Sequence, residues 1–109
     1  MKINDFAARI NAEILTMPDP DAEISGGYCG DLLSWVMGRA EAGQVWITIM
    51  SNINTVAVAS LADVSAILLS EGVEIDEGVI TKASEQGINL LRTAMPTFEA
   101  ALALGEILK

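Results

Sequence analysis

Short apolar runs alternate along the chain with segments of helical spacing, and this alternation limits the possible folds most strongly. Three runs are apolar or β-branched on both faces, which is typical of buried parallel strands: Val45–Met50, Ser65–Ser70 and Ile88–Ala94. Helices are predicted around them, from Asp31 to Ala40, from Thr55 to Ala62, from Asp76 to Gly87, and from Pro96 onward. Such an order requires crossover connections. The prediction is one three-layer α/β/α domain, residues 1–109, with a mostly parallel sheet.

The first 25 residues are predicted to form a helix and a short strand. Asn4 or Asp5 is placed to cap a helix that continues through Ile14, and the proline-containing segment Met17–Asp21 ends it. Ala22–Ser25 is then expected to be a short strand that leads into a glycine-rich segment.

Charge and composition exclude several classes of partner. The 109 residues carry six Lys and Arg against fifteen Asp and Glu, a net charge of −9, and the basic residues do not cluster. Nucleic acid and anionic lipid are therefore not expected partners. No apolar run approaches the roughly 20 residues of a membrane helix. The lone cysteine, Cys29, and the lack of a basic-then-apolar leader predict a cytoplasmic protein.

Three glycines precede the helix predicted from Asp31, namely Gly26, Gly27 and Gly30. A phosphate-binding loop would need a lysine and a hydroxyl at the helix start, but two leucines follow Asp31, and the glycine spacing does not match GxGxxG. We therefore expect a tight turn with positive φ and close approach to a neighbouring element, and we expect the Asp31 carboxylate to cap the helix. A phosphate site remains the alternative.

Polar residues at the end of the strand Val45–Met50 offer a second candidate feature. Ser51, Asn52 and Asn54 follow this strand at its carboxyl end, where open α/β sheets place binding crevices, although an Asx turn or a helix cap is the more common role of such residues. The predicted ligand-binding residues are Gly26, Gly27, Tyr28, Asp31, Asn52 and Asn54. Because no lysine or arginine accompanies them, a neutral or cationic group is expected rather than a phosphate.

No catalytic, metal or cofactor site is predicted. The chain has no histidine, which removes Ser-His and Cys-His nucleophiles and most zinc or copper sites. The acids of Asp19–Glu23 resemble a calcium loop, but Ile24 and Gly30 occupy positions that need glycine and glutamate. Cys29 is interpreted as a turn or core residue, since Asp31 opposes its thiolate. The acids at positions 71, 74, 76 and 77 are expected to form a solvated loop and a helix cap.

Three segments, in order, resemble a DRTGG domain in its small stand-alone form: GGYCGDLLSWVMGRA, VWITIMSNINTVAVASLADVSAILLSEGVEID and GINLLRTAMPTFEAA. The resemblance extends from about Ile24 to the end. Asn52–Ile53 replaces the D-R pair that names the family, and only Gly72 of Ser70–Gly72 matches its T-G-G. Related domains occur in phosphotransacetylases, beside nucleotide-sensing CBS domains and, more distantly, as the N-terminal domain of HPr kinase.

The resemblance implies an α/β/α fold like the HPr kinase N-terminal domain and a non-catalytic regulatory role, binding a small ligand or a protein partner. The alternative is a phosphotransfer enzyme or a kinase accessory domain, although the chain has no GxxxxGK[ST] motif. A homodimer is also predicted, because the last helix is apolar nearly all round. Trp35, Phe98 and Leu104 are the predicted interface residues.

Overall fold

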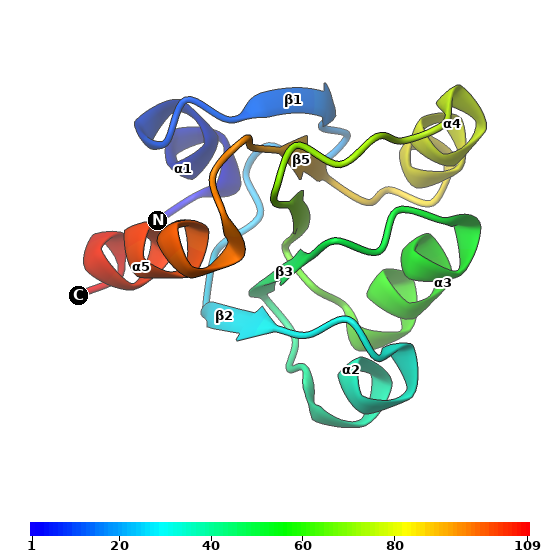
Figure 1. Cartoon of the computed structure of the whole chain (residues 1–109), viewed down its shortest axis with the longest axis horizontal. Helices are drawn as coiled ribbons and strands as arrows, with labels where there is room; N and C mark the ends of the chain where they lie inside the picture. Colours follow the sequence, from blue (N-terminus) through cyan, green and yellow to red (C-terminus); the bar gives the residue numbers. More distant parts are fainter.

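The computed structural model describes all 109 residues, as five helices and five strands (Figure 1). In chain order these are α1 (Ile3–Arg9), β1 (Glu13–Thr16), β2 (Gly26–Cys29), α2 (Leu33–Arg39), β3 (Gln44–Thr48), α3 (Ile53–Ala62), β4 (Ala66–Leu69), α4 (Glu77–Glu85), β5 (Leu90–Arg92) and α5 (Thr97–Ile107). None of the helices combines the length and apolar character needed to cross a membrane.

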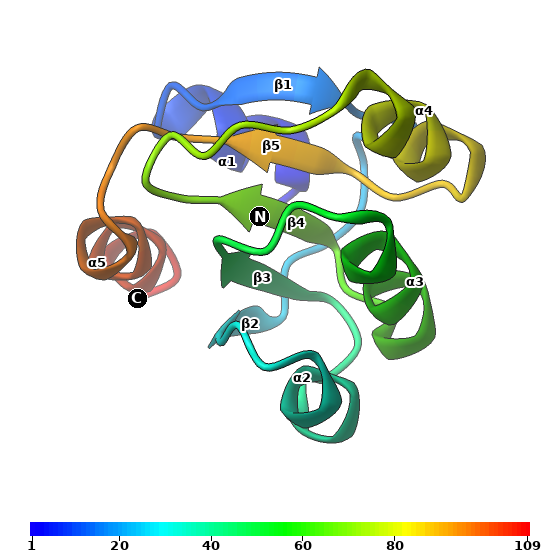
Figure 2. The ribbon, with the colours of Figure 1, turned by 45° about the vertical axis from the view of Figure 1, so that its right-hand side comes forward.

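The five strands form one sheet in the order β1-β5-β4-β3-β2. Strands β2 to β5 are parallel to their neighbours, and only β1 is antiparallel, on β5. Each parallel strand lies beside the next one in sequence, so the connecting helices α2, α3 and α4 all cross on the same face. Helices α1 and α5 cover the other face (Figure 2). The predicted three-layer arrangement with a mostly parallel sheet is confirmed.

Side chains of the central strands alternate between two apolar clusters, one on each face of the sheet. The cluster under α2, α3 and α4 receives Trp46, Ile67, Leu69 and Leu90. The cluster under α1 and α5 receives Val45, Ile47, Ala66, Leu68 and Leu91. Because both faces are covered, these strands need apolar residues at every position, which is the pattern the sequence shows.

The N-terminal prediction is wrong in part. Helix α1 ends at Arg9, Lys2 occupies its N-cap position without a side-chain hydrogen bond, and Ile14 belongs to β1. The strand forms because it pairs with β5. Across this pair Arg92 makes a bidentate ion pair with Glu13, with Nε donating to Oε1 at 2.9 Å and Nη2 to Oε2 at 3.0 Å. The Arg92 hydrogen bond holds the pKa of Glu13 below its ordinary value. No local signal indicates β1, since its partner lies far along the chain.

The strand predicted at Ala22–Ser25 is displaced. Only Glu23 makes an isolated bridge, to Lys2, and the strand proper is Gly26–Cys29. Pairing with β3 decides this position, because Gly26 to Cys29 lie opposite Gln44 to Ile47 in register.

Candidate functional site

The glycine-rich segment is extended and does not form the predicted tight turn. Gly26 and Gly27 lie in β2, and neither they nor Gly30 have positive φ. The expected close approach is present, however, at Gly27. A Cβ atom there would overlap Cδ2 of Leu104, which packs across the strand from α5. The missing side chain at Gly27 thus leaves space for the core residue Leu104.

Asp31 does not cap the following helix, contrary to prediction. Helix α2 has Leu32 at its N-cap position and no side-chain cap. The Asp31 carboxylate instead accepts hydrogen bonds from the Thr48 hydroxyl at 2.8 Å and from the Ile49 backbone N–H at 3.1 Å. Asp31 follows β2, and Thr48 is the last residue of the neighbouring strand β3. The carboxylate therefore joins the β2–α2 loop to the carboxyl end of β3.

Aromatic side chains fill the space around Gly30. Tyr28 is half-buried against the apolar cluster under α2, α3 and α4, called here the α2–α4 cluster. A Cβ at Gly30 would lie 3.0 Å from Tyr28 Cε2. The Trp46 indole N–H donates to the Gly30 carbonyl at 2.8 Å. Cys29 has exposed surface, but neighbouring atoms remove part of the water around its sulfur. This desolvation, and then the nearby Asp31 carboxylate, raise the pKa of the thiol, so a reactive thiolate is disfavoured. These contacts are made within the chain itself, and ligand binding by this segment stays a prediction.

Asn52 caps helix α3, which is the helix-cap explanation that the sequence left open. Its Oδ1 accepts from the backbone N–H groups of Asn54 at 2.9 Å and Thr55 at 3.3 Å. The Asn54 side chain is exposed in the first turn of the helix.

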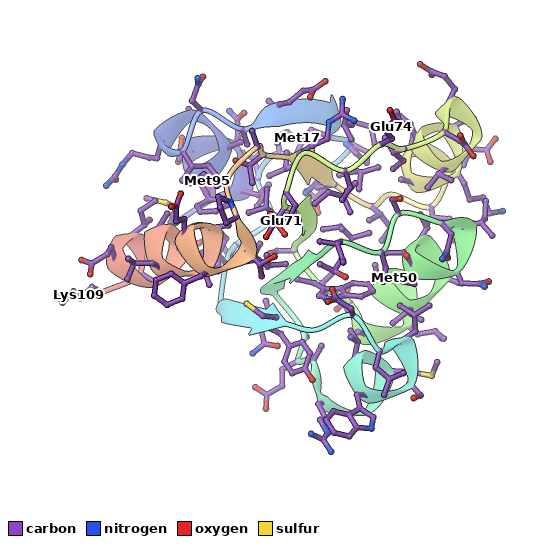
Figure 3. All side chains as sticks on the ribbon, in the orientation of Figure 1. Met17, Met50, Glu71, Glu74, Met95 and Lys109 are labelled. Carbon is purple, nitrogen blue, oxygen red and sulfur yellow. The ribbon has the colours of Figure 1, made fainter.

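Next to this cap lies a pocket of about 380 Å³ at the carboxyl edge of the sheet. The β3–α3 and β4–α4 loops form it, through Ile49, Met50, Ser51, Asn52, Glu74, Ile75 and Asp76. Figure 3 labels Met50 and Glu74, one on each of the two loops. The only charged residues in the lining are Glu74 and Asp76, so the pocket has acidic, amide, hydroxyl and apolar surface but no cation.

The loop after β4 is held in place by Glu71. Glu71 and Gly72 both have φ of +62°, and their N–H groups donate to the carbonyls of Met95 and Thr93 at 2.8 and 2.9 Å. The Glu71 carboxylate accepts from the Thr97 N–H at 2.9 Å, at the start of α5 (Figure 3). Glu71 is therefore a structural anchor and not part of a freely solvated loop. Its geometry fixes the course of the chain toward Glu74 and Asp76.

The structure brings only one predicted binding residue, Asn52, into the pocket lining. Gly26, Gly27, Tyr28 and Asp31 belong to β2 and its loop, outside this lining, and Gly27 lines a separate apolar pocket against α5, so their part in binding stays a prediction. The sequence interpretation missed the β4–α4 side of the pocket, Glu74, Ile75 and Asp76. The signal was available, because these residues also follow the carboxyl end of a parallel strand.

The predicted interface residues differ sharply in exposure. Trp35 and Phe98 are 53% and 77% exposed, and the Arg39 guanidinium lies 3.8 Å from the centroid of the Trp35 ring. Leu104 is only 3% exposed and belongs to the core between α5 and the sheet. Its assignment to an intermolecular surface was wrong, because the last helix needs one apolar face to cover its own sheet.

No family model matches the sequence, and no curated protein matches it. The structure is similar to the crystal structure of the CBS and DRTGG domains of the regulatory region of Clostridium perfringens pyrophosphatase, complexed with its activator, diadenosine tetraphosphate. The TM-score is 0.72 at 14% identity, over 94% of this chain and 45% of that one. The fold is DRTGG-like. This DRTGG-like fold confirms the α/β prediction, whereas similarity to HPr kinase or phosphotransacetylases stays a prediction.

Proposed function

We propose that this DRTGG-like chain is a regulatory module without catalysis of its own, which binds a small ligand in the pocket formed by the β3–α3 and β4–α4 loops. The pocket carries the proposal, because it lies where open α/β sheets bind ligands and because fixed loops build it from both sides. The similar pyrophosphatase region is itself regulatory and was crystallised with an activator, which supports the same class of role.

The lining favours a neutral or cationic ligand with an apolar part. Glu74 and Asp76 attract a positive group or accept hydrogen bonds, and Ser51 adds a hydroxyl. Ile49, Met50 and Ile75 supply the apolar wall. A phosphate would face two carboxylates without an arginine or lysine in the lining, so a nucleotide is disfavoured at this pocket.

The alternative function is phosphotransfer, or service as an accessory domain to a kinase, by analogy with HPr kinase. Its support is the resemblance of the sequence alone, and the pocket chemistry opposes it because phosphoryl transfer needs cations around the phosphate. We propose a cytoplasmic location on the grounds of the lone cysteine.

A thermal-shift screen with two variants that each remove one negative charge from the lining tests the pocket. A specific ligand at about 100 times its Kd adds about 2.7 kcal/mol of stability, which is a rise of several degrees in Tm. We expect Glu74→Gln and Asp76→Asn to reduce that rise by at least half for neutral or cationic ligands. Glu77→Gln is the matched control, because it removes the same charge one residue beyond the lining.

Diadenosine tetraphosphate and ATP are included in this screen as anionic ligands that the proposal expects not to bind in the pocket. If either raises the Tm of the wild type, and Glu74→Gln leaves or increases that rise, the ligand class proposed here is wrong. If no compound in a broad metabolite panel shifts the wild type while the protein binds a protein partner at this edge, the small-ligand proposal is wrong.

We further propose a homodimer formed at the free edge of β2. This strand ends the sheet, and edge strands readily pair with another chain. Trp35 on α2, which follows β2, and Phe98 on α5, which packs on β2, are exposed aromatic side chains on helices that cover opposite faces of the sheet. A two-fold contact between copies would cover both residues.

Sedimentation at micromolar concentration is expected to give the mass of two chains. Trp35→Ala and Phe98→Ala are each expected to weaken the dimer by about tenfold or more, as exposed aromatic anchors do. Leu61→Ala is the control, since Leu61 is 72% exposed on α3, away from this edge. A single-chain mass for the wild type, or equal loss in Leu61→Ala, would exclude this dimer.

A further inference from the structure

A second pocket, of about 260 Å³, opens at the opposite, amino edge of the sheet. The segment Asp19–Glu23 forms one wall, and the carboxyl-terminal ends of α3 and α4 form another. Ser65 and Asn89, the residues directly before β4 and β5, also line it. The site is separate from the pocket proposed above, since the two share no residue.

The electrostatic potential in this pocket is expected to be negative. Asp19, Glu23 and Asp63 line it, and no lysine or arginine does. The ends of α3 and α4 add their carbonyl dipoles, which favour a positive charge. Glu23 already pairs with the Met1 ammonium at 3.3 Å. The carboxylates of Asp19 and Asp63 make neither an ion pair nor a hydrogen bond, so both are free to bind a cation.

A buried hydroxyl without a partner provides the second, independent observation. Ser65 is 6% exposed, and its Oγ has no hydrogen-bond partner. Its place in the strand register puts the side chain on the same face as Ile67 and Leu69, toward α3 and α4, where the pocket opens. Leaving such a hydroxyl unpaired destabilises the free protein, so a ligand that makes a hydrogen bond to it is favoured.

Asn89 keeps the pocket wall fixed. Its Oδ1 accepts from the Asp19 N–H at 2.9 Å, and its Nδ2 donates to the carbonyls of Asp19 at 2.7 Å and Ser65 at 2.9 Å. Asn89 is 2% exposed, so these bonds are shielded from water. They hold the loop that carries Asp19 against the residue that carries the unpaired hydroxyl, before any ligand arrives.

We propose that this amino-edge pocket binds a small organic cation with separated ammonium groups, a diamine or polyamine. One ammonium would pair with Asp63 and another with Asp19, while an N–H group donates to Ser65 Oγ. A metal ion fits less well, because no three acidic, cysteine or histidine side chains lie close enough together to hold one. The separate carboxylates of Asp19 and Asp63 in one pocket match the spaced ammonium groups of a diamine or polyamine.

Calorimetry with spermidine on the full chain tests the proposal. We expect saturable binding of one spermidine per chain, weakened about five- to tenfold in Asp63→Asn and about threefold or more in Ser65→Ala. Asn tolerates the left-handed backbone of Asp63, which has φ of 57°, so this variant removes charge without strain. Glu99→Gln removes the same charge from an exposed position outside both pockets and is expected to change the affinity less than twofold.

Ser65→Ala also gives a readout that a merely structural role would not give. Deleting an unpaired buried hydroxyl is expected to leave the free protein equally or more stable, while the rise in Tm produced by spermidine becomes smaller. A free protein that is less stable in Ser65→Ala would show that the hydroxyl has an internal partner and would overturn its role.

Two further outcomes contradict the site. Equal weakening by Glu99→Gln, or many weak spermidine sites per chain, would mean general attraction to a chain of net charge −9. Displacement of spermidine by Mg²⁺ at matched ionic strength, with the Asp63 dependence retained, would assign the pocket to a metal ion.

Discussion

Gly27→Ala is expected to lower the free energy of unfolding by about 1–3 kcal/mol, as overpacking does in a close-packed core. The added Cβ would overlap Cδ2 of Leu104, and Leu104 is 3% exposed between α5 and the sheet. Leu104 must therefore leave its packed position in the core, toward the apolar pocket of about 200 Å³ that it lines together with Gly27. Urea unfolding by circular dichroism measures the change, at protein concentrations held constant across variants.

Gly26→Ala is the matched control for this prediction. It lies one residue earlier in the same strand, and its added Cβ would meet only the Gln44 side chain, at 3.8 Å. Its effect is expected to stay within about 0.5 kcal/mol. In a Leu104→Ala background the cost of Gly27→Ala should largely disappear, because the clashing atom is gone. A Gly27→Ala cost that persists there would show that backbone strain is the cause.

Trp46→Ala is expected to destabilise the fold by about 3–5 kcal/mol. Trp46 is fully buried at the centre of the α2–α4 cluster, and its indole N–H holds the Gly30 carbonyl at 2.8 Å. The substitution removes the packing of the largest core side chain and leaves that carbonyl without its donor. For a domain with the usual stability of 5–15 kcal/mol, this loss takes up much of the total.

The second tryptophan supplies the control. Trp35→Ala removes the same side chain from a site that is 53% exposed, and is expected to cost less than about 1 kcal/mol under monomeric conditions. Trp46→Phe keeps most of the packing and deletes only the N–H donor, so it should fall between the two. Similar losses for Trp35→Ala and Trp46→Ala would show that burial in the core does not control the stability.

The sequence alone determined the layered fold and most of its central elements. Runs such as Ala66–Leu69 have no polar face, and a strand of this kind is stable only where helices cover both sides of a sheet. Helix α3 was also predicted within two residues of its observed start at Ile53. In each case the residues that decide the structure lie within one element, so periodicity is enough to predict it.

The tertiary structure alone decided the two outer strands and the roles of the polar residues beside them. Strand β1 exists because it pairs with β5, where Glu13 lies opposite Arg92, 79 positions away, and the glycines of β2 extend because they pair with β3. Asp31 binds Thr48 in preference to its own helix. A carboxylate has several nearby donors in the folded chain, and local sequence reveals only one of them. Both pockets depend on such distant pairings, because each is formed by loops from different strands.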